Sequence, residues 1–241
     1  MKPFTLGYVC WRDNDPGPTS ALQDHAKVWR NLPEDIKKHL EIVLIDDCST
    51  PPITHAELGC TDVKIYRIKD DIRWNITGAK NLLMHVAQNE WVLSSDIDFV
   101  ATEDTIRAVF NTPEQKGVWF KVRWKFPLGV DPSLPWTIKT NKRSGSPPGV
   151  FLVHKKDYWA IGGMDEDFAG AWGYDDIYLE HRLNMRLAKR LLDNVVMLYR
   201  EDAMTGGHPV SNNKSLMDRK IRNGCQTTEA LRFEWEERAN E

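Results

Sequence analysis

The chain has 241 residues, of which 41% are hydrophobic and 28% are charged, a composition that is ordinary for a soluble globular protein. This length can bury a substantial core, as one larger α/β domain or as two small ones. The 32 basic and 35 acidic residues leave a formal net charge of -3. That balance gives no electrostatic reason to expect nucleic acid or an anionic membrane surface as a partner.

The cysteines of the chain show neither CxxC spacing nor a recognisable pairing framework. They are Cys10, Cys48, Cys60 and Cys225. This pattern favours a reduced, cytoplasmic setting. We recognise no secretory leader and no run of about 18 apolar residues, so we expect no membrane segment in this chain.

The first hundred residues alternate between apolar runs and helical patterns. We predict strands over Phe4–Trp11, Glu41–Ile45, Val63–Ile68 and Trp91–Leu93, and helices from Ser20 to about Asn31 and from Thr77 to about Gln88. This β-α-β-β-α-β order is typical of a mainly parallel sheet that is covered by helices. In such sheets, ligands bind beyond the carboxyl ends of the strands.

The second half of the chain is less regular. We predict helices over Thr105–Phe110 and Ile177–Leu191, strands over Val118–Phe126, Val150–Val153 and Asn194–Tyr199, and one or two polar helices between Ser215 and Glu237. The long segment from Pro127 to Pro148 is rich in Pro, Gly, Ser and basic residues. Loops of this length are usually functional or disordered, and we expect this one to shape a binding site.

Two acids follow the apolar run Trp91–Leu93, within Ser94-Ser95-Asp96-Ile97-Asp98-Phe99. Residues two apart in an extended segment project to the same side, so Asp96 and Asp98 can aim two carboxylates at one point. Two such groups repel each other unless a cation lies between them, and Mg²⁺ or Mn²⁺ completed by substrate phosphates suits them. The alternative is an ordinary polar turn after a strand.

A second acidic pair, Asp46-Asp47, ends the strand Glu41–Ile45. In a parallel sheet this pair and the Asp96–Asp98 segment lie at the same edge, and we expect them to face one crevice. Their shared position argues against two unrelated polar turns.

A third acidic element lies in Trp172-Gly173-Tyr174-Asp175-Asp176, after a glycine-rich stretch that includes Gly162 and Gly163. Acids at the start of a helix interact favourably with its dipole, and this capping role is the alternative to a catalytic one. Together with the earlier acids, this element predicts two separate chemical roles. One cluster holds a metal and phosphates, and the other takes a proton from an acceptor hydroxyl.

The motifs, taken in order, are Asp46-Asp47-Cys48-Ser49, Gly78-Ala79-Lys80-Asn81, Asp96-Ile97-Asp98, Gly162-Gly163-Met164-Asp165-Glu166 and Trp172-Gly173-Tyr174-Asp175-Asp176. From about residue 4 to about residue 200, the sequence resembles nucleotide-sugar glycosyltransferases of the GT-A fold, close to the family 2 type. The resemblance implies a Rossmann-like α/β fold with a mainly parallel central sheet, flanking helices and a smaller acceptor-side region. It implies one domain over residues 1–241, with a nucleotide-binding half (1–100), an acceptor and catalytic half (101–210) and C-terminal helices (211–241).

The resemblance also assigns roles by position. The implied nucleotide-binding residues are Asp47 with Asp46 beside it, Asp71, Trp74, Asn75, Lys80 and Asp96. Lys80 stands where many relatives carry Arg, so it offers a point charge and not a planar fork. Asp96 and Asp98 match the metal-binding DxD motif, with Mn²⁺ or Mg²⁺ as the cofactor. His208, in a glycine-rich segment, is a candidate third metal ligand, whereas the other histidines are expected to be packing or surface residues.

For the second substrate, the resemblance implies that Asp176 is the catalytic base, with Asp175 as the alternate, because the family usually has Glu-Asp there. Trp172, Gly173 and Tyr174 are implied contacts of the acceptor or sugar. The expected function is transfer of a sugar from a nucleotide sugar, preferably a uridine diphosphate sugar, to a carbohydrate or glycoconjugate hydroxyl with inversion.

Two alternatives to this function remain at this stage. A sugar-phosphate nucleotidyltransferase usually has a basic glycine-rich loop after the first strand, where this chain has Trp11-Arg12-Asp13-Asn14-Asp15. A non-catalytic carbohydrate-binding module explains the ten tryptophans but not the convergent acids.

Overall fold

A computed structural model describes residues 3–13, 16–125, 144–199 and 212–239. Its strands are β1 (Phe4–Cys10), β2 (Leu40–Asp47), β3 (Val63–Ile68), β4 (Trp91–Asp96), β5 (Phe99–Val100), β6 (Val118–Lys125), β7 (Ser144–Gly145), β8 (Phe151–His154), β9 (Ala188–Tyr199) and β10 (Trp235–Arg238). Its helices are α1 (Pro16–Arg30), α2 (Glu34–Lys37), α3 (His55–Leu58), α4 (Ile76–Val86), α5 (Glu103–Phe110), α7 (Lys155–Ala160), the short 3-10 helix η1 (Glu166–Phe168), α8 (Asp175–Asn184) and α9 (Asn213–Arg222).

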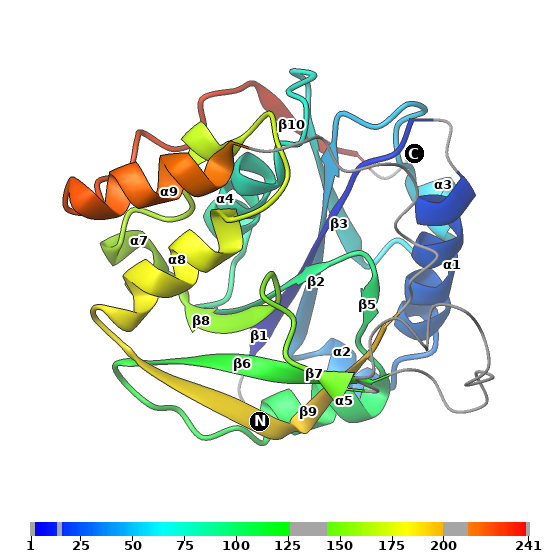
Figure 1. Cartoon of the computed structure of the whole chain (residues 1–241). Coiled ribbons are helices and arrows are strands. Elements are labelled where there is room, and N and C mark those ends of the chain that lie inside the picture. The colour runs from blue at the N-terminus through cyan, green and yellow to red at the C-terminus, as the bar shows by residue number, and fades with distance from the viewer. Residues whose placement is uncertain (1–2, 14–15, 126–143, 200–211, 240–241) are drawn as a thin grey trace, which may run out of the picture.

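The described strands form one sheet in the order β10-β3-β2-β1-β4-β8-β6-β9-β5, with β7 paired to β6 (Figure 1). The first half of the chain builds its parallel part, in which β1 lies between β2 and β4, and β3 pairs with β2. The second half adds β8 antiparallel to β4, so one continuous sheet connects both halves. The prediction of a helix-covered sheet with a mainly parallel core is confirmed.

Side chains alternate along the strands, and each face of the sheet therefore has its own apolar core. On one face, Leu6 and Leu44 pack with residues of α1 and α5, including Trp29 and Ile106. On the other face, strand residues such as Val43 pack with residues of α4, α7 and α8. Figure 1 shows the same division, with α1, α2, α3 and α5 apart from α4, α7, α8 and α9.

Two predictions about the second half are wrong in their boundaries. The helix predicted over Ile177–Leu191 ends at Asn184, and β9 already begins at Ala188. The apolar residues Leu187, Leu191 and Leu192 continue a helix-like spacing, but pairing with β6 recruits this segment into the sheet.

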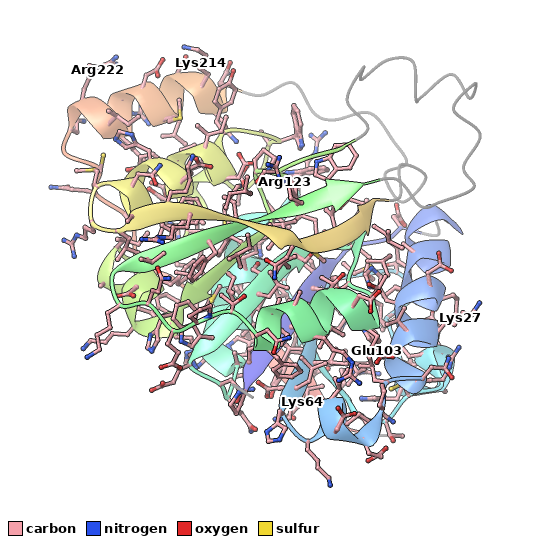
Figure 2. The ribbon with its side chains drawn as sticks, turned by 90° about the horizontal axis from the view of Figure 1, so that it is seen from below. Lys27, Lys64, Glu103, Arg123, Lys214 and Arg222 are labelled. Carbon is pink, nitrogen blue, oxygen red and sulfur yellow. The ribbon has the colours of Figure 1, made fainter. Side chains whose placement is uncertain are left out.

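The C-terminal segment contains one helix, α9, followed by the edge strand β10, where one or two helices were predicted. β10 pairs antiparallel with β3, whose outer edge it covers. Figure 2 shows Lys214 and Arg222 at opposite ends of α9, on the outer surface of the molecule. Among the described residues, no helix combines the length and apolarity that crossing a membrane requires.

Candidate active site

The carboxyl ends of β2 and β4 lie on either side of β1. In the register, Cys10 is opposite Asp46, and Val9 is opposite Asp96. Neighbouring strands are about 4.8 Å apart, so the ends of β2 and β4 are separated by about 10 Å along one edge. The two acidic segments therefore lie at the same edge of the sheet, as predicted.

Asp96 has a buried cationic partner. The Nζ atom of Lys80, on α4, lies 2.6 Å from Oδ1 of Asp96 and donates a hydrogen bond to the Gly149 carbonyl at 2.7 Å. Lys80 is only 1% exposed. A Cβ atom added to Gly149 would lie 2.3 Å from Oδ2 of Asp96, so this close approach requires glycine.

Asp98 lies in the turn between β4 and β5 and is 5% exposed. Burial raises the pKa of its carboxyl well above the usual range, and the charge of Asp96 raises it further. The backbone N–H of Asp98 and the ammonium group of Lys80 lower it in part. The two acids are therefore close enough to repel each other.

This acidic pair fits a hard divalent cation. Both groups offer carboxylate oxygens, and a cation between them would relieve the repulsion that raises the pKa of Asp98. In the described part of the chain, however, no group of three or more His, Cys, Asp or Glu side chains could enclose a metal. Further ligands would have to come from a substrate or from elsewhere in the chain, and His208 lies outside the described residues.

The second acidic element begins α8. Gly173 and Tyr174 have φ values of 94° and 68°, in the left-handed region, and this reversal places Asp175 and Asp176 in the first turn of the helix. Burial raises the pKa of Asp175 to about 7, with a further contribution from the charge of Asp176. Burial also raises the pKa of Asp176, whose carboxylate accepts a hydrogen bond from the Ile177 N–H at 2.7 Å.

The two acidic elements converge on Lys80. Its charge lowers the pKa values of Asp98, Asp175 and Asp176, and the charge of Asp96 raises all three. Residues from β4, the turn after it, α4 and α8 therefore form one electrostatic unit. The buried ammonium group of Lys80 therefore interacts with both acidic elements.

Sequence reasoning missed a second buried cation, Lys121 on β6. Its Nζ atom donates to the carbonyls of Pro147 and Pro148, both at 2.7 Å, and lies 3.6 Å from Oε2 of Glu180. Burial lowers the pKa of Lys121 to about 8, although the negative charges of Glu180 and Asp176 raise it in part. Glu180 is one helical turn after Asp176, a spacing that the sequence does show. The contact with β6 could not be read from the sequence.

Of the predicted nucleotide-binding residues, Asp71 and Asn75 interact with Asp47 at the end of β2. Asp47 is 5% exposed, and the side chain and backbone of Asn75, the residue that precedes α4, lower the pKa of its carboxyl. Burial raises the pKa of Asp47 to about 7, and the charges of Asp46 and Asp71 add to the shift. Trp74, half-buried next to Asn75, has a left-handed φ of 52°. With a pKa of about 7, the Asp47 carboxyl can change its charge near neutral pH.

Asp46 points elsewhere. Its carboxylate is fully buried and accepts hydrogen bonds from the Ser49 N–H at 2.8 Å, the Ile53 N–H at 3.2 Å and Arg67 Nη1 at 2.6 Å. These contacts hold the loop that follows β2. The influence of Asp46 on the site is therefore the charge that it exerts on Asp47.

The predicted acceptor residues lie at the surface beside α8. Trp172 is 46% exposed, whereas Tyr174 is half-buried. The segment before Trp172 is anchored by Asn213 of α9, whose amide donates to the carbonyls of Phe168 and Ala171 at 3.2 and 2.9 Å. An exposed indole on an anchored loop is suited to stacking against a sugar ring.

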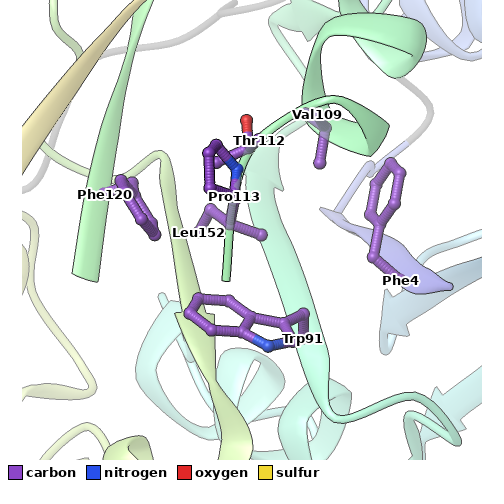
Figure 3. Close-up of a pocket in the computed structure, with 7 residues that line it drawn as sticks. All are labelled: Phe4, Trp91, Val109, Thr112, Pro113, Phe120 and Leu152. Atoms are coloured by element: carbon purple, nitrogen blue, oxygen red, sulfur yellow. The ribbon is translucent and has the colours of Figure 1, made fainter. Parts of the chain in front are cut away.

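A small apolar pocket lies apart from these acids (Figure 3). It is lined by Phe4, Trp91, Val109, Thr112, Pro113, Phe120 and Leu152. Phe4 and Trp91 begin β1 and β4, whereas Asp96 ends β4, so the pocket is at the opposite end of the sheet. It lacks the charged groups that the acidic edge provides, and we assign it no chemistry.

No protein-family model matches the sequence, and no curated protein matches it in sequence. Several solved structures do have a similar fold. Mannosyltransferase PcManGT from Pyrobaculum calidifontis, in complex with GDP-Man and Mn²⁺, aligns with a TM-score of 0.52 and 18% identity. The alignment covers 82% of this chain and 57% of that chain.

Two further structures are similar over most of this chain. S. aureus TarS 1–349 in complex with UDP-GlcNAc has a TM-score of 0.61 and 15% identity, over 92% of this chain and 67% of that one. The catalytic domain of Drosophila β1,4-galactosyltransferase 7 in complex with xylobiose has a TM-score of 0.55 and 13% identity, over 96% and 83%. These similarities show that the chain has the GT-A fold, as the resemblance in sequence implied.

Proposed function

We propose that this chain, which has the GT-A fold, is a metal-dependent glycosyltransferase that moves a sugar from a nucleotide-sugar donor to an acceptor hydroxyl. The observation that carries the proposal is the convergence of Asp96, Asp98, Asp175 and Asp176 around Lys80 at the carboxyl edge of the sheet. The chain spans 57% of the mannosyltransferase chain that it matches, so the activity is argued from its own residues.

In this proposal, Asp47, Asn75, Asp71 and Trp74 bind the nucleoside of the donor. Asp46 supports these residues indirectly, because its carboxylate holds the loop that follows β2. A uridine diphosphate sugar is the donor that we favour, because a carboxylate at Asp47 can accept a hydrogen bond from an imide N–H. The TarS structure contains UDP-GlcNAc, while the mannosyltransferase structure contains GDP-Man.

Asp96 and Asp98 would hold Mn²⁺ or Mg²⁺ against the donor diphosphate, with His208 as a candidate further ligand. Such a cation supplies charge neutralisation at the departing phosphate oxygens. Lys80 contributes a fixed positive charge next to Asp96, within the same electrostatic unit. A point charge suits a diphosphate without imposing the geometry of an arginine fork.

Asp176 takes the proton of the acceptor hydroxyl, and Asp175 is the alternate base. The acceptor oxygen forms a bond to the anomeric carbon while the bond between that carbon and the diphosphate oxygen breaks on the opposite face. This displacement inverts the anomeric configuration. In this proposal, Trp172, Gly173 and Tyr174 contact the acceptor, because they immediately precede the two acids.

Isothermal titration of UDP in the presence and absence of Mn²⁺ tests the donor site. We expect binding that depends on the metal and weakens in Asp96→Asn and Asp98→Asn variants. Metal-independent or absent binding of UDP would count against a metal-dependent uridine donor. A hydrolysis screen over uridine and guanosine diphosphate sugars then identifies the donor without knowledge of the acceptor, because slow transfer to water reports the sugar nucleotide that the site accepts.

A further inference from the structure

A buried histidine contacts the turn that carries Asp98. His25, on α1, is fully buried, and its Nε2 atom lies 2.8 Å from the carbonyl oxygen of Ile97. A carbonyl oxygen only accepts, so Nε2 carries the proton and donates to it. Ile97 is the residue between Asp96 and Asp98, and His25 therefore reaches the centre of the acidic turn.

The same peptide unit also contacts the Asp98 carboxyl. The carbonyl of Ile97 and the N–H of Asp98 belong to one planar group, and that N–H is close enough to the Asp98 carboxyl to lower its pKa. Rotation of this plane would move both partners together. The bond from His25 therefore fixes the orientation of the group that aims the Asp98 carboxylate.

The imidazole ring of His25 is itself held in place. The Tyr8 ring lies 4.3 Å from it and the Trp29 ring 5.5 Å, measured between centroids. The Tyr8 hydroxyl in turn accepts a hydrogen bond from the Ala101 N–H at 3.3 Å, just beyond β5. The turn is thus fixed on both sides by residues that pack against each other.

A buried carbonyl needs a donor in any protein, and this requirement alone could explain the bond. The position of His25 distinguishes it from an ordinary packing residue. Its partner is adjacent in sequence to both acids of the proposed cation site, where β4 ends and the chain crosses to β5 beside β9. Because the Ile97 carbonyl and the Asp98 N–H share one peptide plane, a change in this contact would also move the Asp98 N–H.

We propose that His25 is a positioning residue that holds the Asp96–Asp98 turn in the conformation in which both carboxylates face one cation. The inference rests on the proposed function and goes further, since it assigns this role to a histidine that the sequence marks only as a packing residue. His25 touches neither the cation nor the substrate and acts through the Ile97–Asp98 peptide.

The test compares three variants by isothermal titration of Mn²⁺ in the presence of saturating UDP. His25→Leu removes the donor, His25→Gln retains an N–H at similar reach, and Trp29→Phe disturbs the same packing without removing the hydrogen bond to the Ile97 carbonyl. Partners that orient metal ligands commonly contribute about 10- to 100-fold to metal affinity, and we expect a loss in that range for His25→Leu. His25→Gln should recover most of the affinity, and Trp29→Phe should retain it.

Thermal unfolding in the presence of a chelator measures the structural effect separately. We expect His25→Leu and Trp29→Phe to lower the melting temperature alike, while only His25→Leu loses Mn²⁺ affinity. Unchanged affinity in His25→Leu would overturn the positioning role and leave the proposed function intact. An equal loss in all three variants would reduce His25 to a packing residue. Failure of the wild-type protein to bind Mn²⁺ with UDP would overturn the proposed function, and the positioning role with it.

Discussion

The ammonium group of Lys80 lies 2.6 Å from the carboxylate of Asp96, and Lys80 itself is almost completely buried. This pair connects the first turns of α4 to the end of β4. The lysine also lowers the pKa values of Asp98, Asp175 and Asp176, so one positive charge serves four acids. That charge offsets part of the cost of burying these carboxyl groups, and Lys121 adds to it at Asp176.

Lys80→Met should destabilise the chelator-treated protein at pH 7.5. The variant leaves Asp96 without its partner, and loss of one member of a partly buried pair costs about 2 kcal/mol. The loss should shrink at pH 5, because the Asp175 carboxyl, whose pKa is raised to about 7, is then protonated and no longer interacts with the cation as a charge. Urea unfolding at both pH values measures the effect, with Lys27→Met at an exposed position of α1 as the control (Figure 2). An equal loss at both pH values would contradict the electrostatic explanation.

Asp176→Asn should lower kcat by about 10²- to 10⁴-fold, because an amide cannot accept the proton of the acceptor. The affinity for the donor nucleotide should remain close to that of the wild type, because this side chain serves the acceptor. Steady-state kinetics and titration of UDP provide the two measurements. Asp175→Asn is the matched comparison. Undiminished turnover in Asp176→Asn, with loss in Asp175→Asn, would transfer the role of base to Asp175.

The stability of the chelator-treated protein should fall as the pH rises from 4 to 8. The pKa values of Asp47 and Asp175 are raised to about 7 in the folded state, so the folded state binds more protons than the unfolded chain over this range. Asp47→Asn removes this penalty and should stabilise the protein at pH 8 by on the order of 2 kcal/mol, and by less at pH 5. Urea unfolding at several pH values checks the slope. A wild-type stability that rises over this interval would contradict the assignment.

Gly149→Ala should damage the metal and donor site without large loss of stability. The added Cβ atom would meet Oδ2 of Asp96 at 2.3 Å and Nζ of Lys80 at 3.0 Å, so both groups must move. Displacement of reacting groups by about 1 Å can cost about 10²-fold in rate, and we expect a loss of that size in turnover. Pro148→Ala, at the neighbouring exposed residue, is the control. Wild-type turnover in Gly149→Ala would show that Asp96 and Lys80 can shift to accommodate the added Cβ atom without loss of activity.

Asn81→Leu should destabilise the fold by about 3 kcal/mol, because it leaves several buried polar groups unpaired. The Asn81 amide donates to the Met164 carbonyl at 2.9 Å and to Glu166 at 2.8 Å, and its oxygen accepts from the Tyr158 hydroxyl at 2.6 Å. Chemical unfolding measures the loss. Asn223→Leu, at the exposed end of α9, should change stability by less than about 0.5 kcal/mol. Similar losses of stability in both variants would show that the buried hydrogen bonds of Asn81 do not explain its effect on stability.

Local patterns predicted the parallel half of the sheet well, and long-range pairing explains the errors elsewhere. The strands from Phe4 to Asp96 are apolar runs bounded by turn residues, and their patterns agree with the structure. The segment after Asn184 looks helical by its spacing, but β6 pairs with it over eight positions. β10 is short and polar, and its strand conformation depends on the edge of β3. The local sequence pattern of β10 does not show that β3 is its partner.

The sequence by itself determined which acids could matter, because carboxylates after apolar strands must collect at one edge of a parallel sheet. It could not reveal Lys121, Gly149 or the contact between His25 and Ile97, since each depends on segments that are distant in the chain. Only the tertiary structure decided that Asp46 supports a loop while Asp47 faces Asn75. Adjacent residues of a strand point to opposite faces, and the packing on each face selects their different partners.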